Sequence, residues 1–468
     1  MKQERPNVLL IAVHDLGTRL GCYGSENVPS ANLDRFAAEG VRFTRNFCTA
    51  PYCSPSRGGI ISGQYPHVNG LMGLVNLGWD WRPENHTLAK LLGSAGYETH
   101  LFGFQHEATN DNIESLGFEH VSDRGLKHKC RIVAPMVEEF FAGRGAGDAT
   151  RPFYVRVGFD EVHRSFKDHT PEDPEKVVLP PWVEDSPGAR EDFAEYDGAI
   201  RDMDAAVGRI LAALDAAGLA EDTLVIFTTD HGSPFPRAKA SLYDAGINTA
   251  LMLRWPGGGV SGGVAHDQML SNVDLFPTLL EICGVEVPGN IQGRSFLPLL
   301  RGEEYSPREF IFAGKNTQAT DVKRCLRTER YKYIRNYNPG PRLMLSGDAE
   351  SSLTRRDMNN DHVAPRPEVE LYDLEADPLE RDNLAGRPES GEIERDLAAR
   401  LRGLQEETGD PLLAGPIPRP GIEAGVVGRY WQNARANSRF PREHLEAGYD
   451  VIADPNRKWE FAEPRARF

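Results

Sequence analysis

One pentapeptide, Cys53-Ser54-Pro55-Ser56-Arg57, places a nucleophile and a cation four residues apart. On a helix that spacing puts Arg57 one turn from the Cys53 thiol, and a nearby arginine or a helix N-terminus stabilises a thiolate. A single cysteine near a turn is more often a small buried side chain without reactivity. Polar residues elsewhere in the chain decide between these two interpretations.

Three apolar runs in the sequence each end in residues that could bind a metal. They are residues 8–13 before His14-Asp15, residues 153–159 before Asp160-Glu161-Val162-His163, and residues 224–229 before Asp230-His231. Uninterrupted apolar runs are typical of parallel strands buried on both faces, and ligands bind where the carboxyl ends of such strands meet. An Asp or His after a strand often only turns the chain. Three such groups beside a Cys–Arg loop favour a catalytic site.

The elements that would position these residues alternate between strand and helix. Strands are predicted over 8–13, 41–47, 98–102, 153–159, 224–229 and 251–255, and helices over 87–95, 193–214 and 273–283 and between Ser30 and Gly40. This alternation predicts the α/β class, with a large, mostly parallel sheet sandwiched by helices.

The chain changes character from about residue 308. Short strand-like runs follow at 331–334 and 370–373, and a charged helix is predicted over 392–407. We predict a catalytic domain over residues 1–320 and a smaller α+β domain over 321–468, whose tail from Pro416 has no predicted structure.

Composition narrows the classes of function. The chain has 468 residues and a formal charge of −16, which argues against a nucleic-acid partner. No apolar run approaches the length of a membrane span, and no leader precedes the first strand, so we expect a cytoplasmic protein that does not bind membranes. The six cysteines form no C-x-x-C pair, which favours reduced thiols over a disulfide framework. The sequence does not predict the oligomeric state.

The pentapeptide matches the C-x-P-S-R signature, and the chain resembles the type I, formylglycine-dependent sulfatases of the alkaline phosphatase-like superfamily. The resemblance extends to residues 7–15, 29–47, 228–232 and 370–383, and residues 232–236 are most similar to the N-sulfoglucosamine sulfohydrolase branch. It implies an alkaline phosphatase-like fold whose smaller domain carries an antiparallel sheet. It also implies hydrolysis of a sulfate ester or sulfamate on a sulfated small molecule or saccharide.

In that family a formylglycine-generating enzyme oxidises the cysteine, and the hydrated aldehyde attacks sulfur. The resemblance assigns Cys53 this part and Arg57 the stabilisation of the modified group. It implies that His106 assists expulsion of sulfate, that His163 protonates the leaving group, and that Lys239 clamps the sulfate. The implied ligands of a divalent metal are His14, Asp15, Asp230 and His231.

Three positions depart from the family pattern. His14 stands where an aspartate is usual, so Mn²⁺ or Zn²⁺ competes with the family's Ca²⁺, because imidazole suits those metals better. Phe104 replaces a lysine, for which Arg164 or Arg237 could compensate. The Asp230-His231 pair also occurs in related phosphonate monoester and phosphodiester hydrolases, which are the main alternative function. A non-catalytic protein that binds sugar sulfates is a third possibility.

Overall fold

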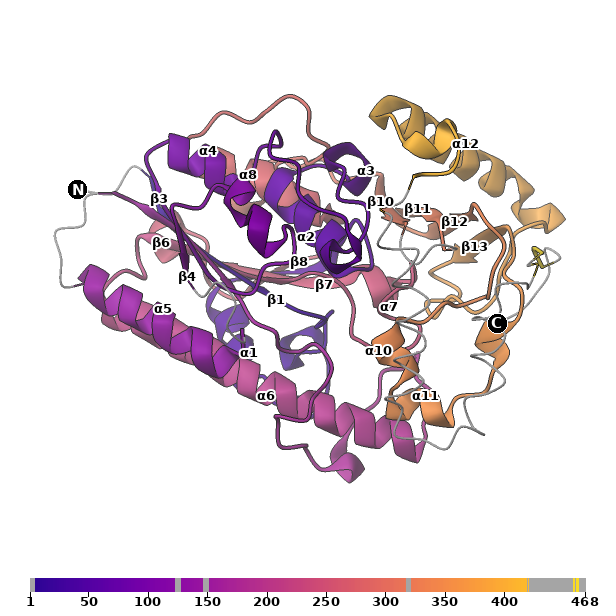
Figure 1. Cartoon of the computed structure of the whole chain (residues 1–468), viewed down its shortest axis with the longest axis horizontal. Coiled ribbons are helices and arrows are strands. Elements are labelled where there is room, and N and C mark those ends of the chain that lie inside the picture. The colour runs from indigo at the N-terminus through magenta and orange to yellow at the C-terminus, as the bar shows by residue number, and fades with distance from the viewer. Residues whose placement is uncertain are drawn as a thin grey trace.

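The computed structural model describes residues 5–122, 128–145, 151–316, 321–418, 420, 458 and 460–462. One large sheet runs through the molecule with helices on both faces, and a small sheet lies beside it under the last long helix (Figure 1). The predicted α/β class and the smaller antiparallel sheet are both confirmed.

The large sheet has the strand order β4-β3-β5-β1-β6-β7-β2-β8, with β9 also paired to β2. Its strands are β1 (Asn7–Val13), β2 (Val41–Phe47), β3 (Glu98–Gly103), β4 (His120–Ser122), β5 (Phe153–Gly158), β6 (Thr223–Thr229), β7 (Asn248–Arg254), β8 (Val264–His266) and β9 (Leu270–Ser271). Among these strands only β7 runs against its neighbours β6 and β2. The carboxyl ends of β1, β2, β3, β5 and β6 therefore meet at one edge.

Alternate residues of the central strand β1 point to opposite faces of the sheet. Leu9 and Ile11 belong to the cluster packed under three helices on one face, α1 (Ala31–Glu39), α5 (Cys130–Gly145) and α6 (Pro187–Ala216). Val8 and Leu10 pack on the other face with α4 (Leu88–Ser94) and α8 (Leu275–Ile282). Figure 1 shows the two layers of helices on either side of the sheet. This two-sided burial explains why the strands lack a polar alternation.

The small sheet is antiparallel, in the order β10-β11-β12-β13. Its strands are β10 (Phe310–Lys315), β11 (Lys323–Thr328), β12 (Tyr331–Asn336) and β13 (Val369–Asp373), and α12 (Gly391–Thr408) packs on it. The sheet begins ahead of residue 320, and the division of the chain at that residue stays a prediction.

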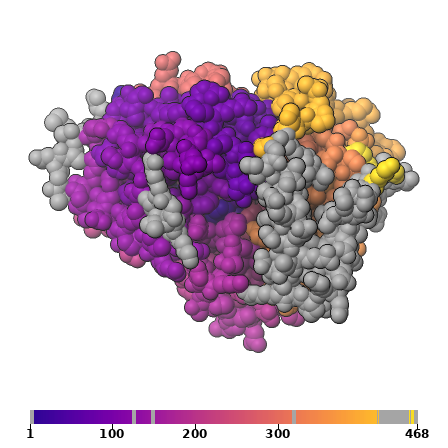
Figure 2. Space-filling model, in the orientation of Figure 1, coloured from indigo at the N-terminus to yellow at the C-terminus, as the bar shows by residue number. Residues whose placement is uncertain are grey.

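The C-terminal helix joins this part to the rest of the molecule. In the space-filling view, α12 lies directly against the N-terminal half (Figure 2). There His67 Nε2, in the short helix α3 (Pro66–Asn69), lies 2.8 Å from Oγ1 of Thr408, the last residue of α12. Most of the tail from Pro416 falls outside the described residues, although the Ala462 amide donates to the Arg366 carbonyl.

Two further observations bear on the sequence predictions. All six cysteines are free thiols, and Trp79 and Trp81 are buried in an apolar cluster with Leu71 and Leu101. Among the described residues, no helix combines the length and hydropathy needed to cross a membrane.

Candidate active site

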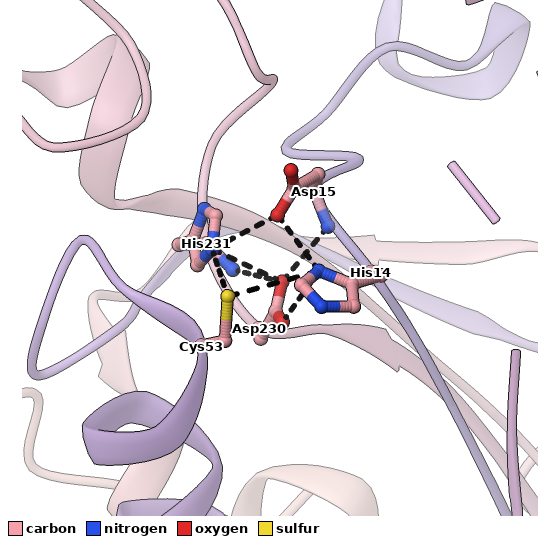
Figure 3. A group of neighbouring side chains, drawn as sticks. All are labelled: His14, Asp15, Cys53, Asp230 and His231. Atoms are coloured by element: carbon pink, nitrogen blue, oxygen red, sulfur yellow. Dashed lines mark hydrogen bonds and ion pairs between the residues drawn. The ribbon is translucent and has the colours of Figure 1, made fainter. Parts of the chain in front are cut away.

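The reactive side chains meet at the edge where the parallel strands end. His14 and Asp15 follow β1, Asp230 and His231 follow β6, and Cys53 opens helix α2 (Cys53–Ser62) beyond the end of β2. Figure 3 shows these five side chains turned toward a common point. Two of the three predicted strand ends therefore meet here, and His163 from the third, β5 (Phe153–Gly158), lies beside them with Nε2 3.9 Å from Asp15 Oδ2.

Helix α2 holds the cysteine at its first turn. Tyr52 is extended and Cys53 is the first helical residue, so the amides at the start of this helix have no partner within the helix. Pro55 fits there because the first turn needs no amide donor. Four residues on, Arg57 Nε donates to Asp230 Oδ2 at 2.9 Å, and its Nη2 donates to the Val13 carbonyl at 2.8 Å. Arg57 thus ties the helix to the ends of β1 and β6.

The cluster offers two carboxylates, two imidazoles and one sulfur. His14 Nδ1 lies 2.7 Å from Asp15 Oδ1 and 3.3 Å from Asp230 Oδ2, and His231 Nε2 lies 3.1 Å from Asp15 Oδ1. Cys53 Sγ lies 3.4 Å from His231 Nε2 and 3.9 Å from His14 Nδ1. All five potential ligand atoms fall within 4.8 Å of one another and are buried. This donor set fits a divalent metal, and its imidazoles suit Mn²⁺ or Zn²⁺.

Charges inside the cluster shift its titrating groups in opposite directions. Burial lowers the pKa of His14, but the neighbouring Cys53, Asp230 and Asp15 outweigh burial and raise this pKa to about 9. Burial raises the pKa of Cys53, but the positive charges of His14, Lys239 and His231 outweigh it and hold this pKa well below its ordinary value. The site therefore stabilises an anionic group at residue 53.

Lys239 reaches the cluster because β7 is reversed. A strand antiparallel to β6 begins at the edge where β6 ends, so the connection between them remains at that edge. Within this connection Lys239 Nζ lies 2.6 Å from Asp15 Oδ2 and 2.9 Å from Asp348 Oδ2. His163, which follows β5, lies beside them with Nε2 3.7 Å from Asp348 Oδ2.

Asp348 is a site residue that the sequence analysis missed. It lies in the short helix α10 (Gly347–Glu350), far along the chain from the strand ends. No apolar periodicity or motif marks its surroundings in the sequence. Only its charge could have drawn attention to it, and the chain has 69 acidic residues.

His106 and Phe104 come from the turn after β3. The His106 ring centroid lies 6.3 Å from that of His14, and its buried Nδ1 has no hydrogen-bond partner among the described residues. Its amide donates to Glu107, which is held by an ion pair with Arg156. Phe104 packs with its ring centroid 5.0 Å from the Arg57 guanidinium carbon, a cation–π contact. The residue in the usual lysine position thus braces Arg57.

Arg164 and Arg237 were suggested as replacements for that lysine, but the side-chain contacts described for them lie outside the cluster. Arg164 is bound to Asp192 at 2.6 and 2.8 Å, and Arg237 donates to the Leu379 carbonyl at 2.7 Å. The expectation that one of them compensates is therefore not supported. The nine residues predicted for the site do lie together, and their roles stay predictions: His14, Asp15, Cys53, Arg57, His106, His163, Asp230, His231 and Lys239.

Comparisons with known proteins agree with this geometry. An ulvan-active sulfatase of Formosa agariphila is 29% identical over 96% of this chain and 82% of its own length. The N-sulphoglucosamine sulphohydrolase of Homo sapiens is 27% identical over 88% of this chain and 93% of its own length.

Solved structures share the fold. A protein in complex with its substrate D-glucosamine-2-N,6-O-disulfate matches with a TM-score of 0.68 and 20% identity, covering 87% of this chain and 98% of that one. A phosphonate monoester hydrolase of Agrobacterium radiobacter matches with a TM-score of 0.65 and 22% identity, covering 89% and 100%. The fold by itself therefore does not separate sulfuryl from phosphoryl transfer.

Two family models match the chain. A model described as N-sulphoglucosamine sulphohydrolase, C-terminal, matches residues 237–346. The model described as sulfatase matches residues 6–285, which is more than half of the chain. This protein belongs to the sulfatase family of sulfuric ester hydrolases.

Proposed function

We propose that this sulfatase hydrolyses a sulfate ester or sulfamate on a saccharide, with residue 53 as the position of the nucleophile. One observation carries the proposal. Cys53 Sγ lies 3.4 Å from His231 and 3.9 Å from His14, inside a buried ring of metal-binding groups. The names of the curated relatives, an ulvan-active sulfatase and an N-sulphoglucosamine sulphohydrolase, support a saccharide substrate.

Two groups that the family uses fit this site. His14, Asp15, Asp230 and His231 would hold a divalent cation, which supplies Lewis-acid polarisation of a sulfate oxygen. Cys53 would be converted to formylglycine by a formylglycine-generating enzyme, and its hydrated form supplies an oxygen nucleophile. Lys239, one of the charges that lower the pKa of Cys53, would also stabilise negative charge on that oxygen.

The remaining residues act on the substrate. Lys239 is a buried cation beside the cluster, and it would bind a sulfate oxygen while Asp15 and Asp348 fix its position. The His163 side chain is 35% exposed, so it can reach a leaving group that extends out of the site. It would pass a proton to the departing oxygen or nitrogen, and burial and the Lys239 charge, which lower its pKa, make it ready to give that proton up. The hydrogen bond from Arg57 to Asp230 would fix the positions of residue 53 and Asp230 relative to each other.

Replacement of Cys53 tests the proposal. Cys53→Ala should abolish turnover of 4-nitrocatechol sulfate and of sulfated sugars, whereas Cys22→Ala, a cysteine 3.8 Å from the Met252 sulfur and outside the site, should not. A peptide mass spectrum across residue 53, from protein co-expressed with a formylglycine-generating enzyme, should show the mass loss of thiol-to-aldehyde conversion. Full activity in Cys53→Ala would refute the role of this residue.

Phosphonate monoester or phosphodiester hydrolysis remains the second candidate, because Asp230-His231 and Phe104 depart from the sulfatase pattern. The family assignment weighs against it. Rates on an aryl sulfate and on the matching aryl phosphonate decide the matter, and we expect the sulfate to react faster.

A further inference from the structure

A second cluster of potential metal ligands, Glu98, His100 and His120, lies on the large sheet away from the catalytic cluster. Glu98 and His100 belong to β3, and His120 is the first residue of β4, the strand at one end of the sheet. The catalytic residues gather beyond the carboxyl ends of the parallel strands. Glu98 opens β3 and lies roughly 16 Å before that end, at about 3.3 Å per residue. This cluster therefore takes no part in the chemistry described above.

The pairing of two strands brings the three side chains to one face of the sheet. In the parallel pair of β3 and β4, His100 lies directly opposite His120. Glu98 precedes His100 by two residues, so both point to the same face. That face packs against α5 (Figure 1), where the ring centroid of Phe140 lies 4.6 Å from that of His100 and Arg144 binds Glu98 Oε2. Two strands and a helix thus fix the position of the cluster.

Two imidazoles approach one carboxylate oxygen. Glu98 Oε1 lies 2.7 Å from His100 Nε2 and 3.8 Å from His120 Nε2. The first distance is a hydrogen bond, and the second is too long for one. The two rings are stacked, with centroids 4.5 Å apart and an interplanar angle of 22°. A direct hydrogen bond therefore joins Glu98 to one imidazole, although all three potential ligand atoms lie within 4.8 Å of one another.

These separations fit a tetrahedral metal ion. Zn²⁺ binds imidazole nitrogen and carboxylate oxygen at about 2.0–2.2 Å, which places neighbouring ligand atoms roughly 3.4 Å apart. The observed 2.7 and 3.8 Å lie on either side of that value, so small side-chain rotations suffice. The metal would replace the proton that His100 shares with Glu98. Access is open on the side of His120, whose side chain is 54% exposed.

The charges at the cluster favour a metal bound with moderate affinity. Burial lowers the pKa of His100, so its imidazole is neutral near pH 7, which is the form that binds a metal. Arg144 binds the other oxygen of Glu98, which orients the carboxylate and leaves Oε1 facing the histidines. Because the Arg144 charge offsets that of Glu98, we expect a Kd on the order of micromolar.

We propose that Glu98, His100 and His120 form a second metal site, which binds Zn²⁺ and joins the edge strand β4 to β3. β4 has three residues, and among the described strands it pairs only with β3. A metal held by His120 and by two residues of β3 adds a link across this pair. Since a ligand that binds only the folded state stabilises it by mass action, the metal supports the fold and leaves hydrolysis unchanged.

Zinc content and thermal unfolding test the site. The whole protein is dialysed to equilibrium against about 10 µM free Zn²⁺, roughly ten times the expected Kd, and bound zinc is measured by mass spectrometry of the metal. Wild type should hold about one zinc ion per chain more than His120→Asn, because loss of an outer partner alone weakens metal binding about 10–100-fold. The catalytic cluster is the same in both proteins, so it does not affect this difference. Zn²⁺ should also raise the unfolding temperature of wild type by more than that of the variant.

Two further variants make the result specific. Glu98→Gln keeps the shape of the side chain and should lose the same zinc ion. His266→Asn is the matched control, because His266 lies on β8 at the other end of the sheet and belongs to no group of three such ligands in the described part of the chain. It should keep the wild-type zinc content.

The outcomes that would overturn the site are clear. One is equal zinc content in wild type, His120→Asn and Glu98→Gln, and another is a loss of zinc in His266→Asn as large as that in His120→Asn. His120 is exposed, so its variant should fold. Turnover of 4-nitrocatechol sulfate at the wild-type rate would verify that fold, since the cluster lies away from the catalytic edge.

Discussion

The link between Lys239 and Asp348 can be tested by Asp348→Asn, which removes one negative charge at nearly constant shape. Asp348 Oδ2 lies 2.9 Å from Lys239 Nζ, and its side chain is 14% exposed. A hydrogen bond between ionised groups contributes about 1.5–3 kcal/mol. Lys239 keeps its bond to Asp15, and asparagine still offers an acceptor, so we expect the lower part of this range.

A loss of about 1.5–2 kcal/mol in the transition state lowers kcat/KM by roughly tenfold to thirtyfold. Initial rates on 4-nitrocatechol sulfate measure it, and thermal unfolding of the same samples shows whether the fold is intact. Asp373→Asn is the control, because Asp373 pairs at 2.7 Å with Arg330, which is 53% exposed. Exposed pairs contribute about 0–1 kcal/mol, so this control should keep wild-type kinetics.

Two results would refute the reasoning. One is an Asp348→Asn enzyme whose kcat/KM stays within about twofold of wild type, a difference of less than 0.5 kcal/mol. The other is a fall in activity fully matched by a fall in unfolding temperature, since Asp348 would then support the fold alone and not the position of Lys239.

Three other predictions follow from the described contacts. Removal of metal with EDTA should abolish turnover, and Mn²⁺ or Zn²⁺ should restore more activity than Ca²⁺ because two proposed ligands are imidazoles; better recovery with Ca²⁺ would contradict this. Asp321→Asn should lower the free energy of unfolding in urea by about 3–5 kcal/mol, because it leaves three buried cations, among them Arg366, without their shared carboxylate; an unchanged midpoint would be inconsistent with this. Burial and the Arg324 charge lower the pKa of His67 from 6.5 to about 4. The contribution of His67 to stability is therefore present above pH 6.5 and lost as the pH falls to 4. In His67→Gln, the urea midpoint should change less over that pH range than in the wild-type protein.

Much of this architecture could be predicted because its signals are local. The strand β1 shows as an apolar run, and the end of α1 shows as Gly40. The nine site residues could be proposed because some of them follow strands or belong to the Cys53–Arg57 motif, and the family resemblance supplied the others, such as His106 and Lys239. Parallel topology then brings the strand ends together whatever the length of the connections.

Features that depend on distant pairing could not be predicted. The reversal of β7 leaves no mark in its composition, since a strand buried on both faces reads alike in either direction. The place of Asp348 depends on how the small sheet docks against the large one. The contact between Phe104 and Arg57 also forms only when helix α2 meets the turn after β3. In each case the decisive partner lies far away in the sequence.

The dispersal of the site along the chain has a kinetic consequence. The Asp15 amide donates to Asp230, 215 residues away, and Lys239 is fixed by Asp348, 109 residues further on. Contacts of such long range form late and slowly, because loop closure must precede them. During refolding from urea, helical circular dichroism should recover well before the first turnover. The interval between the two signals would measure how long the long-range contacts at the carboxyl edge of the sheet take to form.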